Sequence, residues 1–462
     1  MRLAEGMSLR LIEWLYDRPA ESTVAWRGSE RLTIAQLRLE VAALSAWMAS
    51  QTARRWALCL DDAYSFTVAL LACAQTGVQA VLPGHRRPAA LAELAPHLDA
   101  MLVDGDWPGS AELPFPVWSW SSVMPEALGR SSTLPLARSE LPLSLLMFTS
   151  GSTGLPQPVL KQERELLAEV AVQAQLWAPL MQQTLLLATV SQQHIYGLLF
   201  RILLPLHLGV PFWAATLTTP EQLCQVAQMW RQPWGLVSSP AFLEHLDPAL
   251  PVANGRWLVT SGGPLSTAGA TLSRECLDLA AVELYGSSET GGIAWRQERD
   301  HDWSLLPGVA LSVDAQGDWW LDSPFLPAGE RWRLADRIAW QDNGFRLLGR
   351  ADRIIKLAEK RISLDEVERR LQALDWVQEA VVVPLLLGRR TGLGAVVVPT
   401  PQGWQWHADL GNGRLLWRLR QELGVWLEPV ALPRRLRCLN ALPCNAQGKR
   451  QYAELKELFD EA

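Results

Sequence analysis

A short run of hydroxyl-bearing residues and glycines, TSGSTG at residues 149–154, directly follows an apolar stretch of the chain. Glycine geometry can free backbone N–H groups, and these donors together with four hydroxyls can surround the oxygens of a phosphate. The run is not a Walker loop, because no lysine follows Gly154 and the glycine spacing differs, and it is not a GxGxxG dinucleotide fingerprint. Taken alone, it is best interpreted as a serine-rich surface turn, so other segments have to decide its function.

Five further segments follow this loop in a fixed order and carry glycines, hydroxyls and charged residues. The order and spacing of the six segments resemble the adenylate-forming superfamily, which includes acyl-CoA synthetases, aryl-acid ligases and the adenylation domains of peptide synthetases. The resemblance covers nearly the whole chain, and six motifs in order are strong evidence where one would be weak. The five segments are SQQHIYGLL (191–199), VTSGGPLS (259–266), YGSSETGG (285–292), LADRIAWQDNGFRLLGRADRIIK (334–356) and NAQGKRQY (445–452).

Enzymes of this superfamily join a carboxylate to the α-phosphate of ATP, release pyrophosphate and then pass the acyl group to a thiol. The reaction brings two anions together, so charge neutralisation and positioning should dominate the catalysis. The resemblance therefore implies an ATP-dependent, AMP-forming acid-thiol ligase that uses ATP and Mg²⁺.

The resemblance also implies a role for each matched residue of the nucleotide site. The glycine-loop hydroxyls would hold the β- and γ-phosphates, Tyr285 would lie against adenine, and Ser288 would contact the α-phosphate. Glu289 would hold the Mg²⁺ that bridges the phosphates. Asp336 would bind the ribose hydroxyls, and Arg350 would add a ribose or phosphate contact. The implied nucleotide-binding residues are Thr149, Ser150, Gly151, Ser152, Thr153, Gly154, Tyr285, Gly286, Ser288, Asp336 and Arg350.

The implied catalytic residues are Lys449, Glu289 and His194. Lys449 matches the family's C-terminal lysine, which can contact both the incoming carboxylate and the α-phosphate and so stabilise charge in the transition state. An ordinary exposed lysine is the alternative. His194 lies where an aromatic residue or histidine often borders the reacting carboxylate, and a core histidine bonded to a backbone carbonyl has similar weight. Asp352 occupies the family's hinge position between two domains.

Two residues depart from the family pattern. Gln157 stands where the glycine loop usually continues with a lysine, so the amide can still donate hydrogen bonds but the positive charge is lost. Lys161 is a candidate to restore a cation near the pyrophosphate, and an exposed charge at a helix start is as plausible. Glu359 replaces a glycine beside the family's thiol passage, which puts the acceptor in doubt. Lys356 keeps the same segment basic, which suits a phosphopantetheine phosphate or an acidic carrier protein.

The PQ after the glycine loop and the EKR after the hinge look like the stand-alone AMP-ligases of bacterial pigment pathways such as aryl polyene biosynthesis. That likeness would imply an aromatic acid, such as a hydroxybenzoate or hydroxycinnamate, passed to an acyl carrier protein or CoA in trans. No aspartate lies near His194 in the sequence to pair an α-ammonium group, so an aryl or acyl acid is favoured over an amino acid. Two alternatives stay open: a non-catalytic homologue that binds nucleotide or acyl groups, and an adenylating enzyme with a non-thiol acceptor.

Apolar periodicity predicts the elements that position these residues. Helices are expected at 32–49 and 65–77 and strands at 55–60 and 78–83, an alternation that indicates a mostly parallel α/β architecture. The glycine loop is expected to join the strand at 143–148 directly to a helix that begins near Glu163.

A change of composition near Gly349 predicts two domains. Residues 1–349 would form an N-terminal domain that binds AMP and the acid, and residues 350–462 a C-terminal lid domain that carries Lys449. By resemblance, the fold class is α/β. The large domain would have sheets layered with helices and a small barrel-like part, and the lid would be a small, mobile α+β domain.

The composition of the whole chain limits its partners. The 462 residues are 49% hydrophobic and 19% charged with a formal net charge of -6, so the chain is too long for one core and lacks a basic field for nucleic acid. The first residues lack the apolar core of a secretory signal, and no stretch is apolar enough to span a bilayer. The six cysteines show no CxxC pairing, so disulfides and structural zinc are disfavoured and a cytoplasmic location is expected.

Overall fold

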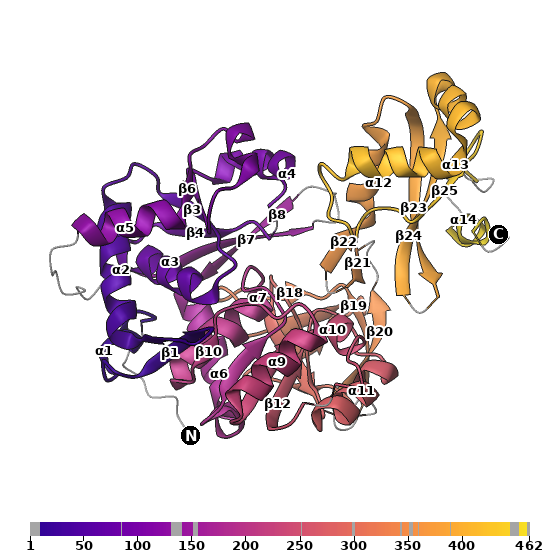
Figure 1. Cartoon of the computed structure of the whole chain (residues 1–462). Coiled ribbons are helices and arrows are strands. Elements are labelled where there is room, and N and C mark those ends of the chain that lie inside the picture. The colour runs from indigo at the N-terminus through magenta and orange to yellow at the C-terminus, as the bar shows by residue number, and fades with distance from the viewer. Residues whose placement is uncertain are drawn as a thin grey trace. The chain divides into compact units, whose positions relative to one another are not determined.

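A computed structural model shows that the chain divides into two compact units (Figure 1). Unit 1 comprises residues 1–84, 94–148 and 158–349, and unit 2 comprises residues 85–93, 149–157 and 350–462. The residues that the structure describes are 10–84, 86–130, 141–150, 156–250, 252–297, 301–341, 344–350, 354–358, 360–388, 390–443 and 452–459.

A six-stranded sheet, in the order β6-β5-β3-β4-β7-β8, forms the first half of the N-terminal part. The pairs β3·β4, β3·β5, β4·β7 and β5·β6 are all parallel. The helices and strands predicted between residues 32 and 83 are confirmed, and Gly77 ends the second helix with a left-handed φ of 69°. The elements are α2 (Ile34–Ala49), β3 (Arg55–Cys59), α3 (Ala63–Thr76), β4 (Gln79–Leu82), β5 (Ala100–Val103), β6 (Val117–Ser119), α5 (Trp120–Arg130), β7 (Ser144–Ser150) and β8 (Pro156–Gln162).

The second large sheet of the N-terminal part has nine strands in the order β15-β14-β13-β12-β11-β9-β10-β1-β2. Its centre is parallel, and β2, β14 and β15 pair antiparallel at its two ends. Its elements are β1 (Thr23–Arg27), β2 (Glu30–Thr33), α6 (Glu163–Met181), β9 (Leu185–Ala188), α7 (Ile195–Gly197), β10 (Phe212–Trp213), α9 (Pro220–Trp230), β11 (Trp234–Ser238), β12 (Gly255–Thr260), α11 (Thr267–Leu277), β13 (Val282–Ser287), β14 (Gly291–Arg296) and β15 (Ser304–Leu305).

Strand β9 shows how this sheet is buried on both faces. Successive side chains of a strand point to opposite faces. Leu186 and Ala188 accordingly join the large core that also includes residues of α2, α3 and α6. Leu185 and Leu187 join a separate core with residues of α9 and α11. The sheet is therefore covered by a helical layer on each side, which is why its central strands are continuous apolar runs.

The expected direct connection from the glycine loop to a helix is wrong, because strand β8 comes between them. The helix itself begins at Glu163 as predicted. Strand β8 contains Pro156 and Pro158, which favour a loop when only the local sequence is considered. The six-stranded sheet places β8 at its edge, where a residue without an N–H is tolerated, so tertiary pairing overrides the local signal.

Three small sheets follow the nine-stranded sheet along the chain. The first has three antiparallel strands, β16 (Ala310–Val313), β17 (Trp319–Asp322) and β18 (Trp332–Arg333). The second consists of β19 (Asp336–Gln341) and β20 (Gly344–Arg350), and the third of β21 (Ile354–Leu357) and β22 (Lys360–Ser363).

Unit 2 contains a three-stranded sheet, in the order β23-β24-β25, with its own apolar core. Strands β23 and β24 form a long antiparallel hairpin, and β25 joins β24 in parallel. This mixture is α+β, as expected for the C-terminal part. Its elements are α4 (Pro88–Glu93), α12 (Leu364–Gln372), β23 (Val377–Leu387), β24 (Arg390–Pro399), α13 (Pro401–Leu423), β25 (Arg435–Cys438) and α14 (Tyr452–Glu457).

Among the described helices, none combines the length and apolarity needed to cross a membrane. No disulfide joins the cysteines within the described ranges, and most of these cysteines are buried. Burial raises the pKa of the Cys438 thiol to about 11 and also raises that of Cys73, so these side chains behave as small apolar residues.

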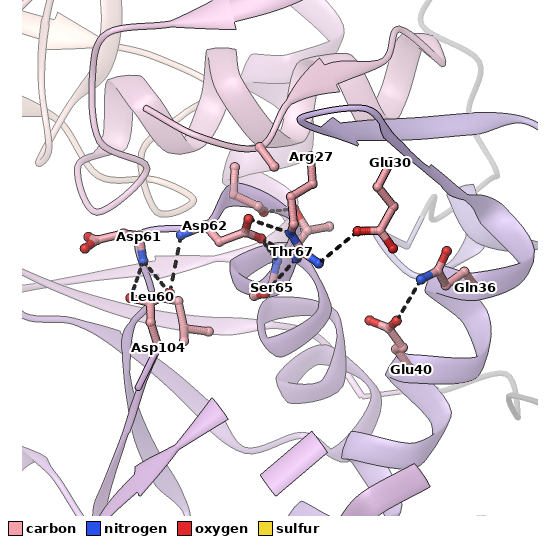
Figure 2. Close-up of polar contacts among 12 residues, drawn as sticks. Arg27, Glu30, Gln36, Glu40, Leu60, Asp61, Asp62, Ser65, Thr67 and Asp104 are labelled. Atoms are coloured by element: carbon pink, nitrogen blue, oxygen red, sulfur yellow. Dashed lines mark hydrogen bonds and ion pairs between the residues drawn. The ribbon is translucent and has the colours of Figure 1, made fainter. Parts of the chain in front are cut away.

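An ion pair between β1 and the start of α3 ties the two large sheets together (Figure 2). Arg27 donates from Nη2 to Asp62 Oδ1 at 2.8 Å and from Nε to Asp62 Oδ2 at 3.0 Å. Asp62 Oδ1 also accepts the N–H of Ser65 at 2.8 Å and so caps α3. One carboxylate thus serves both the helix end and the contact between sheets.

Replacing Asp62 with alanine should lower the free energy of unfolding by about 1–3 kcal/mol, because the cap and the bidentate pair are lost together. Chemical denaturation measures the change. Glu21→Ala is the matched control, since Glu21 pairs with Arg31 at 3.7 Å with its side chain 84% exposed and should contribute at most about 1 kcal/mol. Equal effects of the two substitutions would contradict the interpretation.

Candidate functional site

The segment YGSSETGG forms the turn between β13 and β14, and the turn is closed by two hydroxyls. The N–H of Ser287 donates to Thr290 Oγ1 at 3.1 Å, and the N–H of Thr290 donates to Ser287 Oγ at 3.3 Å. Ser288 and Glu289 lie between these residues and are half-buried. The turn therefore holds an acidic and a hydroxyl side chain at the end of a parallel strand, where ligands of open α/β sheets commonly bind.

Tyr285 lies on β13, just before this turn, and contacts Asp336, the first residue of β19. The phenol donates to Asp336 Oδ2 at 2.8 Å. The tyrosine ring packs against Trp303 and Phe345 at centroid distances of 5.8 and 6.1 Å. The structure thus brings together two residues, 51 positions apart, that the sequence motifs assigned to adenine and ribose. Their assignment to those groups stays a prediction.

Lys161 lies beneath the same turn. Its side chain is buried, and Nζ donates to the backbone oxygens of Glu289 at 2.8 Å and of Phe325 at 3.0 Å. Burial lowers the pKa of Lys161, and the carboxylates of Glu169, Glu165 and Glu289 oppose that change. The expected alternative of an exposed charge at a helix start is wrong, because β8 carries this residue into the interior. The ammonium group contacts the backbone of the turn, and its contact with pyrophosphate stays a prediction.

Glu169 on α6 approaches the other end of the turn. Its Oε1 accepts the N–H of Gly292 at 2.8 Å and the side-chain amide of Gln173 at 3.1 Å. Burial raises the pKa of Glu169 to about 7, although the two hydrogen bonds and the charge of Lys161 act in the opposite direction. Glu169 lies outside the six sequence motifs, so it was not among the predicted site residues. The signal was an acidic residue among the inward positions of an amphipathic helix, beside the buried Leu166 and Val170.

Three glycines of the segment are required by close packing. A Cβ at Gly286 would lie 2.3 Å from the backbone oxygen of Gly291 across the hairpin. A Cβ at Gly291, where φ is +69°, would lie 2.4 Å from Glu169 Oε2, and one at Gly292 would lie 3.0 Å from Glu169 Oε1. The paired glycines after Glu289 therefore make room for the buried carboxylate of α6.

The segment SQQH at residues 191–194 is fixed by its two glutamines to the end of β3. Gln192 Nε2 donates to the backbone oxygen of Leu60 at 2.7 Å, and Gln193 Nε2 donates to that of Leu58 at 2.6 Å. Arg201 is fully buried and donates to Gln192 Oε1 at 2.7 Å. These bonds join the nine-stranded sheet to the six-stranded sheet within unit 1.

His194 follows the two glutamines and precedes α7. Its side chain is exposed, so the alternative of a buried core histidine is wrong. A Cβ at Gly84 would lie 3.6 Å from His194 Cε1, which places the histidine beside the loop after β4. The hydroxyl of Tyr196 donates toward the backbone oxygens of Ser238 and Val259, at 3.0 and 2.9 Å, where β11 and β12 end. His194 and Tyr196 therefore lie near the carboxyl ends of parallel strands, and the catalytic role of His194 stays a prediction.

Of the remaining predicted residues, the structure describes Thr149 and Lys356. Thr149 is half-buried near the end of β7, and Lys356 is half-buried on β21. Their predicted phosphate and thiol contacts are untested. The residues or side chains outside the described part are Ser150, Gly151, Ser152, Thr153, Gly154, Arg350, Asp352, Glu359 and Lys449.

Comparison with known sequences identifies a protein family and several similar enzymes. A model of a family described as AMP-binding enzyme matches residues 12–316. A 4-coumarate–CoA ligase from Halorhodospira halophila is 32% identical over 324 residues, which cover 66% of this chain and 75% of the relative. A 4-coumarate–CoA ligase from Cereibacter sphaeroides is 34% identical over 309 residues, covering 65% of this chain and 68% of the relative.

Comparison with solved structures gives the same kind of fold. The o-succinylbenzoate CoA synthetase of Bacillus subtilis matches with a TM-score of 0.81 at 17% identity, covering 97% of this chain and 98% of that chain. An amide bond synthetase from Marinactinospora thermotolerans matches with a TM-score of 0.77 at 19% identity, covering 98% and 100%. At these identities the likeness concerns the fold alone.

Glu169 should make the stability of the protein depend on pH. An unfolded glutamate titrates near 4.5, whereas the folded protein keeps Glu169 protonated up to about pH 7. The folded state therefore binds the extra proton between these values, and this stabilisation is lost as the pH rises through 7. The free energy of unfolding of the wild type, relative to Glu169→Gln, should fall by about 1.4 kcal/mol per pH unit within this window. Denaturant titrations across the window test this, and parallel pH curves for the two proteins would rule it out.

Proposed function

The chain belongs to the family of AMP-binding enzymes and has the adenylate-forming fold, a large α/β part followed by a C-terminal lid, and from this premise we propose its reaction. It activates a carboxylic acid with ATP as an acyl-adenylate and then passes the acyl group to a thiol. The sequence prediction of the family is confirmed.

The contact between Tyr285 and Asp336 carries this proposal. Tyr285 is 8% exposed, and its ring is held by Trp303 and Phe345, so it can offer a fixed apolar surface to a purine. The bond from its hydroxyl orients the Asp336 carboxylate, and the two oxygens of a carboxylate suit the two vicinal hydroxyls of a ribose. A fixed ring and an oriented carboxylate on neighbouring elements suit an adenosine group.

The turn beyond Tyr285 fits the triphosphate and its metal. Within the described ranges, no group of three or more acidic, histidine or cysteine side chains could hold a metal ion by itself. Mg²⁺ normally keeps several waters and binds through one or two carboxylates together with substrate phosphates, so the single carboxylate of Glu289 is a sufficient protein ligand. Bound Mg²⁺ would neutralise phosphate charge, and Ser288 would donate a hydrogen bond to the α-phosphate.

We assign the remaining steps to residues of three other segments. The hydroxyls of residues 149–154 hold the β- and γ-phosphates, and Arg350 adds a ribose or phosphate contact. Lys449 contacts both the acid carboxylate and the α-phosphate, so it stabilises the charge that builds up as the carboxylate attacks phosphorus and pyrophosphate leaves. His194 borders the acid, and Asp352 is the hinge about which the lid domain turns. These roles rest on the motif matches.

The proposed acid is aromatic or acyl. Relatives at 32% and 34% identity are named for 4-coumarate, an aromatic acid, and for CoA as thiol acceptor. The phosphopantetheine thiol of an acyl carrier protein is the second acceptor that we propose. Lys356, Lys360 and Arg361 form a basic segment, which suits the phosphate of that group. The link to aryl polyene biosynthesis is part of the proposal and rests on the PQ and EKR segments alone.

Acid-dependent ATP–pyrophosphate exchange over a panel of benzoates, cinnamates, fatty acids and amino acids tests the first half-reaction. Exchange should be strongest with aromatic acids, and each positive acid should then form a thioester with CoA or with a holo carrier protein. ATP binding without exchange for any acid would overturn the proposal in favour of a non-catalytic homologue. Exchange without a thioester would overturn the transfer step in favour of a non-thiol acceptor.

Lys449→Ala should lower the exchange rate about 100-fold or more, because the charge developing at the α-phosphate loses its lysine. Thioester formation from preformed acyl-adenylate should stay largely intact, since that step does not pass through the same transition state. Lys456→Ala is the matched control, because Lys456 is an exposed lysine of α14 that follows Lys449 closely in the sequence. Exchange by Lys449→Ala at the rate of the wild type would reject the assignment.

A further inference from the structure

The turn that carries Glu289 is held by two buried polar side chains that do not belong to its own sheet. Both come from one continuous stretch, Lys161 on β8 and Glu169 on α6. Lys161 donates to the backbone oxygen of Glu289, and Glu169 accepts the N–H of Gly292, three residues later. The two contacts therefore fix opposite ends of the segment 289–292.

Lys161 joins two segments that are far apart in the sequence, the turn at Glu289 and the segment around Phe325. One ammonium group bonds the oxygens of Glu289 and Phe325, at 2.8 and 3.0 Å. Hydrogen bonds from a charged donor are about twice as strong as neutral ones. Burying an ammonium group is costly unless such partners are present, so the backbone oxygen of Glu289 is held strongly at a defined position.

The contact of Glu169 is equally constrained. Its carboxylate fills the space that side chains at positions 291 and 292 would occupy, and the positive φ of Gly291 turns the N–H of Gly292 toward it. Gln173 donates to the same oxygen from the next turn of α6. The backbone after Glu289 therefore has one well-defined path.

We propose that Lys161 and Glu169 are positioning residues that clamp the backbone of the turn so that the carboxylate of Glu289 is aimed at Mg²⁺·ATP. This inference rests on the role given to Glu289 in the proposed function. It gives Lys161 a task different from that of a substitute for the glycine-loop lysine, because the ammonium group acts on protein backbone. Groups that orient a metal ligand in this way typically change metal affinity 10- to 100-fold when they are removed.

The test is the Mg²⁺ dependence of ATP binding, measured by calorimetry without any acid, so that no turnover is needed. Lys161→Met removes the donor, and Glu169→Leu removes the acceptor. Each should raise the Mg²⁺ concentration for half-maximal ATP binding by about 10-fold and leave Mg²⁺-free ATP binding unchanged. Glu169→Gln keeps an acceptor oxygen for the N–H of Gly292, so this variant should retain most of the Mg²⁺ response that Glu169→Leu loses.

Glu163→Leu is the matched control, since Glu163 is also a buried glutamate of α6 and accepts the N–H of Leu143, away from the turn. It should lower the melting temperature without changing the Mg²⁺ response. If Lys161 and Glu169 only stabilise the fold, their substitutions will behave like this control, and the inference fails. If Lys161→Met does not fold, the comparison of Glu169→Leu with Glu169→Gln decides the matter alone.

A double-mutant cycle separates this inference from the function on which it rests. Glu289→Gln should itself weaken the Mg²⁺ response, and adding Lys161→Met to it should cause no further loss, because both act through the same carboxylate. Additive losses would overturn the clamp. If Glu289→Gln leaves the Mg²⁺ response unchanged, the proposed role of Glu289 fails first, whatever Lys161→Met does.

Discussion

The buried ammonium group of Lys161 imposes a constraint on which much of the candidate site depends. A charge removed from water must find strong partners, and here two backbone oxygens from separate segments provide them. The need to satisfy this group draws the turn after β13 and the segment around Phe325 onto the edge strand β8. Glu169 completes the arrangement from α6. Gly291 and Gly292 have no side chains, and this leaves room for the carboxyl group of Glu169.

The same principle of distant segments held by a few polar contacts recurs across unit 1. Gln192 and Gln193 reach from the second sheet to the end of β3, and Arg27 reaches from β1 to the cap of α3. In each case a side chain satisfies backbone groups or a carboxylate at the end of a strand or helix, where intrinsic partners are missing. These contacts tie the six-stranded and nine-stranded sheets of unit 1 together at the ends of their strands.

Much of the fold could be predicted from local patterns, because strands and helices of the N-terminal part have strong and distinct apolar periods. The helix at Glu163 and the strands around residues 55–60 and 78–83 illustrate this. The edge strand β8 could not be predicted, since its two prolines oppose a strand locally and only the position at the sheet edge permits it. His194 likewise could be exposed or buried until the packing around α7 was known.

The sequence by itself determined the family, because six short motifs in a fixed order carry chemistry that survives wide divergence elsewhere. It also determined that the loop TSGSTG lacks its usual lysine at Gln157. Only the tertiary structure decided what Lys161 contacts and that Glu169 belongs to the same site, since both depend on which backbone atoms lie within about 3 Å of a buried polar group. Spacing along a chain records the order of functional groups, whereas the hydrogen bonds of buried polar groups such as Lys161 and Glu169 are formed with residues more than a hundred positions away.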